Sequence, residues 1–198
     1  MFSLTLDRII NGIIFVGTLF CYTLCFRSEG RWSWKEGVRH LKFFTTLSNL
    51  FSAFAALCVL LTLRETGLPY WAWILKYIAS ASVIVTFLTV MVFLIPTMGY
   101  KSQMEGIGFF VHLIGPLLAL YSFCFLECFY PLSFRVSLLA ILPVLLYGLV
   151  YLVKVVFRNR WEDFYGFNRG GKWKISFMAM MIGGFLVGML FLALYRFA

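Results

Sequence analysis

A threonine and a histidine are the residues of this chain best suited to catalysis. Thr45 lies near the start of one apolar stretch, and His112 lies in a later one, four residues before Pro116. A histidine beside a hydroxyl can accept its proton and return that proton to a leaving group, which is the minimum arrangement for nucleophilic catalysis. The simpler alternative, a histidine that hydrogen-bonds a hydroxyl only for packing, stays open at this stage.

Polar side chains share one helical face with Thr45. Spacings of three, one and three residues place Ser48, Asn49 and Ser52 on that face, and Thr46 points about 100° away. Such residues commonly join membrane helices by hydrogen bonds. They also predict a lined cavity in which Ser48 or Asn49 stabilises an oxyanion and Ser52 and Thr46 contact substrate. The choice between Thr45 and Thr46 as nucleophile stays open.

The segment around His112 is interrupted by a proline. Pro116 has no N–H, so the carbonyl four residues before it, that of His112, is expected to lack its helical partner. A free carbonyl in a membrane needs a polar partner or water. Small residues surround the histidine at intervals of four, three, four and three, a pattern that lets another helix approach closely: Gly108, His112, Gly115, Ala119 and Ser122.

Composition shows which kind of protein must position these residues. Of the 198 residues, 62% are hydrophobic and 13% are charged, and the mean hydropathy is +0.92. Soluble domains carry about 25% charged residues, so a soluble enzyme or a nucleic-acid partner is excluded. Six apolar runs reach the length of about 20 residues that spans a bilayer. They predict one all-α membrane domain, 1–198, built as a six-transmembrane-helix bundle with spans 9–26, 41–63, 71–95, 107–129, 134–157 and 175–197.

Basic residues predict the orientation of the bundle. Twelve of the 17 Lys and Arg residues belong to the odd-numbered connections, and the other five, among them Lys76, belong to the opposite side. The positive-inside rule then places the odd-numbered connections in the cytoplasm and both termini on the opposite side. In either orientation the second, fourth and sixth helices begin on the same side, so Thr45 and His112 are expected at one end of the bundle.

The fifth connection begins on that same side. Trp161, Tyr165 and Asn168 could cover a cavity there or contact a lipid headgroup. The alternative is an ordinary belt of aromatic residues at the membrane interface.

The patch from 42 to 50, with its threonine followed by Ser48 and Asn49, and the His112–Pro116 pair resemble the androgen-induced membrane hydrolase family and its small bacterial multi-pass relatives. The resemblance implies hydrolysis of fatty acid esters of hydroxy fatty acids, with Thr45 as nucleophile and His112 as base. It implies a membrane lipid or fatty-acyl ester as substrate and no cofactor. The animal members have an acidic residue shortly after the threonine and one more residue between histidine and proline, which leaves the substrate open.

Two other functions stay open. One is a small transporter or channel, and the other is a non-catalytic membrane protein with a polar lipid-binding cavity. Transporters often bury several ionisable groups, whereas only His112 is expected deep in a span and Glu127 is expected at the interface. Cys and His do not cluster at metal-ligand spacing, so no metal is expected.

Overall fold

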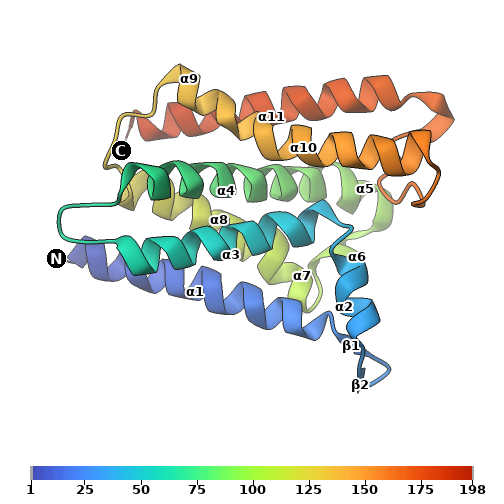
Figure 1. The fold of residues 1–198 in the computed structure, drawn as a ribbon, viewed down its shortest axis with the longest axis horizontal. Helices are drawn as coiled ribbons and strands as arrows, with labels where there is room; N and C mark the ends of the chain where they lie inside the picture. The colour runs from blue at the N-terminus through green and yellow to red at the C-terminus, as the bar shows by residue number, and fades with distance from the viewer. Residues whose placement is uncertain (1, 198) are drawn as a thin grey trace.

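The computed structural model describes residues 2–197 and shows a bundle of long helices that run side by side (Figure 1). Within these residues, six helices are long and apolar enough to cross a membrane. The predicted all-α six-helix bundle is confirmed, and the protein is a multi-pass membrane protein. Met1 and Ala198, the two ends of the predicted domain, lie outside the described residues. The bundle helices are α1 (Phe2–Leu24), α3 (Phe44–Thr62), α4 (Tyr70–Thr89), α7 (Ile107–Phe109) with α8 (Gly115–Tyr121), α9 (Phe134–Ser137) with α10 (Ile141–Tyr151), and α11 (Trp173–Tyr195).

Short elements extend or connect these helices. The π-helical turns η1 (Val90–Leu94), η2 (Phe110–Ile114), η3 (Ser122–Leu126) and η5 (Leu152–Phe157) continue bundle helices, as do the 3-10 turn η4 (Leu138–Ala140) and α5 (Ile95–Met98). The first connection holds the antiparallel pair β1 (Arg27–Ser28) and β2 (Arg31–Trp32) and then α2 (Trp34–His40). The later connections hold α6 (Tyr100–Met104) and the 3-10 turn η6 (Arg169–Gly171).

The predicted and observed starts of the first two spans differ by three residues or more, whereas the starts of the later spans agree within two residues. The first span begins at Leu4 rather than at 9, because the polar Asp7 and Asn11 are buried inside the bundle instead of lying before it. The second span begins at Phe44 rather than at 41, because the residues up to His40 form the separate helix α2.

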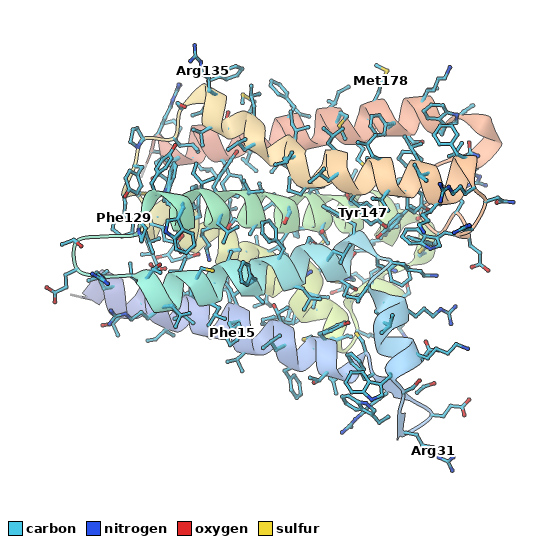
Figure 2. The ribbon with its side chains drawn as sticks, viewed as in Figure 1. Phe15, Arg31, Phe129, Arg135, Tyr147 and Met178 are labelled. Atoms are coloured by element: carbon cyan, nitrogen blue, oxygen red, sulfur yellow. The ribbon has the colours of Figure 1, made fainter. Side chains whose placement is uncertain are left out.

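The helix α4 lies in the middle of the bundle, in contact with α3, α8, α10 and α11. Its aromatic side chains Trp73 and Tyr77 are fully buried and pack against Phe123 and Phe191. Large apolar side chains cover the outside of the bundle, as lipid contact requires (Figure 2). The bundle therefore has a tightly packed aromatic centre and an apolar exterior.

Two prolines shape the helices next to the candidate site. Because proline lacks an N–H, the preceding turn loses its regular hydrogen bonds. Before Pro96, the Ile95 N–H bonds the Val90 carbonyl, and before Pro116, the Gly115 N–H bonds the Phe110 carbonyl. Both bonds reach five residues back, so η1 and η2 are wider than an α-helix.

The helices α3, α7 and α11 begin at the same end of the bundle, the end that carries α2, and both termini lie toward the other end (Figure 1). This arrangement places Thr45 and His112 at one end, as the order of the spans predicts.

The expectation that only His112 is a deep ionisable residue is wrong. The side chains of Asp7, Lys76 and Glu127 are all buried, with exposures of 1%, 0% and 0%. Lys76 therefore does not lie at the membrane surface, and Glu127 does not lie at the interface. Each is surrounded by side chains of neighbouring helices that neutralise or hydrogen-bond it, which is why the apolar runs can contain them.

Candidate functional site

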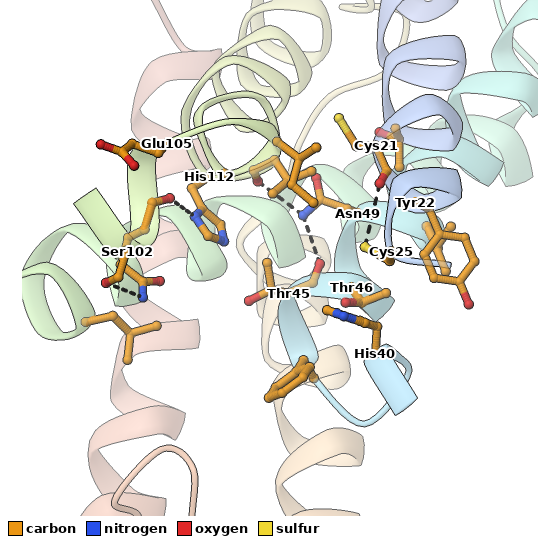
Figure 3. A pocket seen from close by; sticks show the side chains of 18 of the residues that line it. Cys21, Tyr22, Cys25, His40, Thr45, Thr46, Asn49, Ser102, Glu105 and His112 are labelled. Atoms are coloured by element: carbon orange, nitrogen blue, oxygen red, sulfur yellow. Dashed lines mark hydrogen bonds between the residues drawn. The ribbon is translucent and has the colours of Figure 1, made fainter. Parts of the chain in front are cut away.

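Thr45 and His112 line the same cavity, which has a volume of about 490 Å³ (Figure 3). The cavity lies where α3 and η2 begin, and Thr46 and Asn49 of α3 line it as well. His40, at the end of α2, supplies a second imidazole to its wall. From the sequence, His40 could be placed only in a basic connection, because no strong sequence pattern predicts the short helix α2 that turns its ring toward the bundle.

One hydrogen bond determines the tautomer of His112. Its Nδ1 atom lies 2.6 Å from the backbone carbonyl oxygen of Gln103, in α6. A carbonyl can only accept, so Nδ1 carries the proton and the Nε2 lone pair is left for a group in the cavity. In Figure 3 this second nitrogen lies on the Thr45 side of the ring. The neutral ring is therefore oriented as a proton acceptor.

Glycine makes room for that bond. The chain returns from α6 to η2 through Gly106, which adopts a positive φ of 61°. A Cβ atom on Gly108 would collide with the Gln103 carbonyl oxygen. Only a residue without a side chain lets this carbonyl reach the His112 ring.

The side chain of Asn49 joins the two halves of the site. Its Nδ2 donates to the Thr45 carbonyl at 2.8 Å and to the Val111 carbonyl at 3.2 Å. The Val111 carbonyl is free because the Gly115 N–H bonds Phe110 instead and the next residue, Pro116, has no N–H. The free carbonyl was expected at His112. The wider turn of η2 moves it by one residue, to Val111.

Tyr165 reaches Thr45 from the fifth connection. Its phenol oxygen accepts a hydrogen bond from the Phe44 N–H at 3.1 Å, which satisfies a backbone donor left open at the start of α3. The same phenol contacts the Thr45 side chain. Burial raises the pKa of Tyr165, although hydrogen bonds from Phe44 and Thr45 oppose the shift. The phenol therefore stays protonated and can donate into the cavity.

Hydrogen bonds hold the fifth connection in place. The carboxylate of Asp163 accepts from the Tyr151 hydroxyl at 3.0 Å and from the backbone N–H groups of Phe167 and Asn168 at 2.7 Å each. Of the three residues predicted to cover the cavity, Tyr165 lines it. Trp161 and Asn168 do not line it: Trp161 packs against Tyr151, and the Asn168 backbone belongs to the Asp163 turn.

A second cavity, of about 520 Å³, adjoins the first. Thr45 and Tyr165 line both cavities. The second cavity is mostly apolar, with Val144 and Tyr147 on one side and the exposed Val92 on the other. Thr45 thus lies between a cavity that contains several polar side chains, called here the polar cavity, and a more apolar one.

The other predicted polar residues of α3 lie outside the polar cavity. The Ser48 hydroxyl donates to the Thr45 carbonyl at 3.1 Å and lies 2.8 Å from the Thr86 hydroxyl of α4. Ser52 is buried one turn deeper, with 3% of its surface exposed. Both residues contribute to the packing of α3 against its neighbours. Across residues 2–197, no group of three His, Cys, Asp or Glu side chains could hold a metal ion.

No protein family, curated protein or solved structure matches this chain. The resemblance to the androgen-induced membrane hydrolases therefore stays a prediction from the sequence.

The bond between His112 and Gln103 can be tested by Gly108→Ala. Because the added methyl group collides with the Gln103 carbonyl, we expect His112 to lose its preference for the Nδ1-protonated tautomer. Nitrogen-15 NMR of labelled histidine in detergent measures this preference, and His40→Gln identifies the His112 signals. Gly12→Ala is the control, since a Cβ there has no neighbour within 4 Å. Unchanged His112 shifts in Gly108→Ala would contradict the assignment.

Proposed function

We propose that this protein is an intramembrane hydrolase of fatty-acyl esters, with Thr45 as nucleophile and His112 as general base. The observation that carries the proposal is the orientation of His112. Its Nδ1–H donates a hydrogen bond to the Gln103 carbonyl, and its Nε2 atom faces the cavity that Thr45 lines (Figure 3). A hydroxyl, a base and a group that orients the base are the parts of a nucleophilic hydrolase site.

The reaction proceeds in two steps. The Thr45 hydroxyl attacks the acyl carbonyl while His112 Nε2 takes its proton, and the alcohol leaves with that proton as the C–O bond of the ester breaks. Water then attacks the acyl-threonine, gives a proton to His112, and releases the fatty acid as the threonine regains its hydrogen. The histidine acts first as base and then as acid in each step, and no cofactor is needed.

Tyr165 is the best placed donor for the oxyanion. Both amide hydrogens of Asn49 are used by backbone carbonyls, and the Ser48 hydroxyl is bonded outside the cavity. The phenol of Tyr165 accepts the Phe44 N–H and still has its own hydrogen to donate, next to the Thr45 and Tyr147 hydroxyls. The positive end of the α3 dipole adds to this stabilisation at Thr45. We therefore assign the oxyanion role to Tyr165 rather than to Ser48 or Asn49.

The two cavities divide the substrate between them. An acyl chain fits the apolar cavity, whose lining residues Val92 and Phe93 are 73% and 48% exposed on the lipid-facing side. A lipid can therefore enter sideways from the membrane. The Lys42 ammonium lies 5.0 Å from the centre of the Phe164 ring at the polar cavity, where it would attract an anionic headgroup or fatty-acid carboxylate. The positive-inside rule directs this end toward the cytoplasm.

A small transporter is a second candidate function, because Asp7, Lys76 and Glu127 are buried in the bundle. Buried ionisable groups are typical of membrane carriers. Flux of fatty-acyl substrates into proteoliposomes, measured with Thr45→Ala, separates the two functions. A carrier keeps its flux in that variant, and a hydrolase shows none in either form.

Removal of the nucleophile or the base tests the proposed reaction. In Thr45→Ala and His112→Ala we expect hydrolysis of fatty-acyl esters to fall at least about 100-fold, because each loses a group that takes part in the chemical step. The purified variants are assayed in detergent by release of fatty acid. Thr45→Ser should keep measurable activity because its hydroxyl remains.

Thr46→Ala is the matched control, because Thr46 lines the same cavity but points to another side of α3. We expect it to keep most of the activity. Hydrolysis that is retained in Thr45→Ala and lost in Thr46→Ala would identify Thr46 as the nucleophile instead. Retention in both variants would exclude a threonine nucleophile.

Ala179→Phe tests the place of the acyl chain. Ala179 lines the apolar cavity and is exposed on the outside of α11, so a larger side chain narrows the cavity without crowding the core. We expect hydrolysis of long-chain esters to fall relative to short-chain esters by about 10-fold or more. Ala193→Phe, at an exposed position further along α11, should leave the ratio unchanged. An unchanged ratio of long-chain to short-chain hydrolysis in Ala179→Phe would show that the acyl chain does not bind in this cavity.

A further inference from the structure

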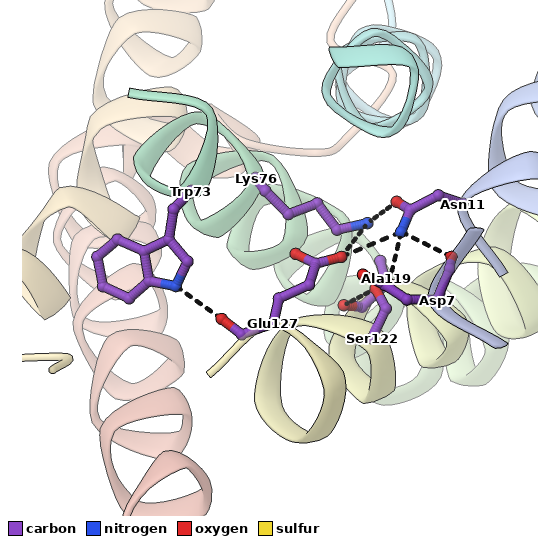
Figure 4. Close-up of polar contacts among 7 residues, drawn as sticks. All are labelled: Asp7, Asn11, Trp73, Lys76, Ala119, Ser122 and Glu127. Carbon is purple, nitrogen blue, oxygen red and sulfur yellow. Dashed lines mark hydrogen bonds and ion pairs between the residues drawn. The ribbon is translucent and has the colours of Figure 1, made fainter. Parts of the chain in front are cut away.

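A second polar cluster (Figure 4) lies toward the end of the bundle at which α1 and α4 begin, opposite to the end at which α3 begins (Figure 1). It contains Asp7 and Asn11 of α1, Lys76 of α4 and Glu127, which follows η3. All four side chains are at most 1% exposed. The cluster is separate from the proposed hydrolytic site.

Hydrogen bonds connect the four side chains. The Lys76 ammonium donates to Asn11 Oδ1 at 2.5 Å and pairs with Glu127 Oε1 at 3.6 Å. The Asn11 amide donates in turn to Asp7 Oδ1 at 2.8 Å and to Glu127 Oε1 at 3.1 Å. One amide nitrogen thus holds two carboxyl groups close together.

The charges of the cluster do not balance if both carboxyls are ionised. Lys76 neutralises one carboxylate, and the neighbouring Arg8 is turned away to the Leu63 carbonyl, at 3.2 Å. The remaining titratable groups that face Glu127 are the thiols of Cys124 and Cys128 and the phenol of Tyr195, none of which carries positive charge. A net negative charge would therefore be buried in the bundle, which is costly.

Two oxygens of the cluster also lack a hydrogen-bond donor. Among the described residues, nothing donates to Asp7 Oδ2 or Glu127 Oε2, although both are buried. The two side chains lie within hydrogen-bonding reach of each other. A carboxyl pair at this separation is joined by a hydrogen bond when one member keeps its proton. One proton bound by this pair would make the net charge of the cluster zero, and it would form a hydrogen bond between the two carboxyls, whose outer oxygens otherwise lack a donor.

We propose that Asp7 and Glu127 form a proton-binding site in which one proton is shared between the two carboxyls at neutral pH. Lys76 balances the one remaining negative charge, and Asn11 keeps the carboxyls together. This inference is independent of the proposed hydrolase activity.

Infrared spectroscopy of the intact protein in detergent tests the proposal directly. A protonated carboxyl gives a carbonyl band that shifts in heavy water. We expect this band in the wild type at about pH 7, well above the ordinary carboxyl pKa of about 4, and its loss in Asp7→Asn and in Glu127→Gln. Glu65→Gln, which removes an exposed carboxyl at the same end, should keep the band. Absence of the band in the wild type would overturn the proposal without any variant.

Thermal unfolding against pH gives a second measurement. The folded chain holds one proton that the unfolded carboxyls release, so stability must fall as the pH rises. For the wild type, we expect the ratio of folded to unfolded protein to fall by as much as about tenfold for each pH unit between about pH 5 and pH 8. Asp7→Asn leaves a neutral Lys76–Glu127 pair and should show a flatter profile. An equal slope in the wild type and in Asp7→Asn would contradict the shared proton.

Discussion

The side-chain amide of Asn49 is the contact on which the candidate site depends. It bonds the Thr45 carbonyl of α3 and the Val111 carbonyl of η2, so it determines how the two helices meet. The second bond exists only because Pro116 withholds a donor from the turn before it. The unpaired carbonyl of η2 thus accepts a hydrogen bond from a side chain of α3, and this bond brings Thr45 and His112 to one cavity.

The same constraint explains most of the other polar contacts. In hydrocarbon, a polar group without a partner is costly, so each must find one within the protein. Tyr147 bonds the Lys42 carbonyl, Tyr165 bonds the Phe44 N–H, and Tyr77 bonds the Ser137 carbonyl. Each of these tyrosines ties the backbone of one element to another. Much of the specificity of the bundle therefore comes from polar contacts, since lipid offers little hydrophobic driving force between helices.

The sequence was sufficient to predict the bundle and the end of it at which the candidate site lies. Six apolar runs and the order of the spans place Thr45 and His112 together without any knowledge of packing. The partner of His112 could not be predicted, because Gln103 acts through its backbone carbonyl and its approach depends on the turn at Gly106. Tyr165 could be recognised only as one aromatic among several in its connection.

The buried charges were missed for a different reason. Hydropathy is averaged over a span, so a single Lys76 in a run of apolar residues changes it little. Its partner Asn11 is 65 residues away in the chain, a separation that no local pattern reports. Asp7 and Asn11, four residues apart, did carry a signal, because this spacing places two polar groups on one helical face.

The order of the buried cluster along the chain has a consequence for biogenesis. Asp7 enters the membrane with the first span, Lys76 with the third, and Glu127 arrives last, at the end of the fourth. Until then the nascent chain exposes an acid and a base whose cluster is incomplete, and insertion of isolated charged residues is unfavourable. The first three helices must therefore stay close to the insertion machinery, or to one another, until the fourth completes the cluster. Synthesis of the fourth span is the point at which Asp7, Lys76 and Glu127 can all reach their partners.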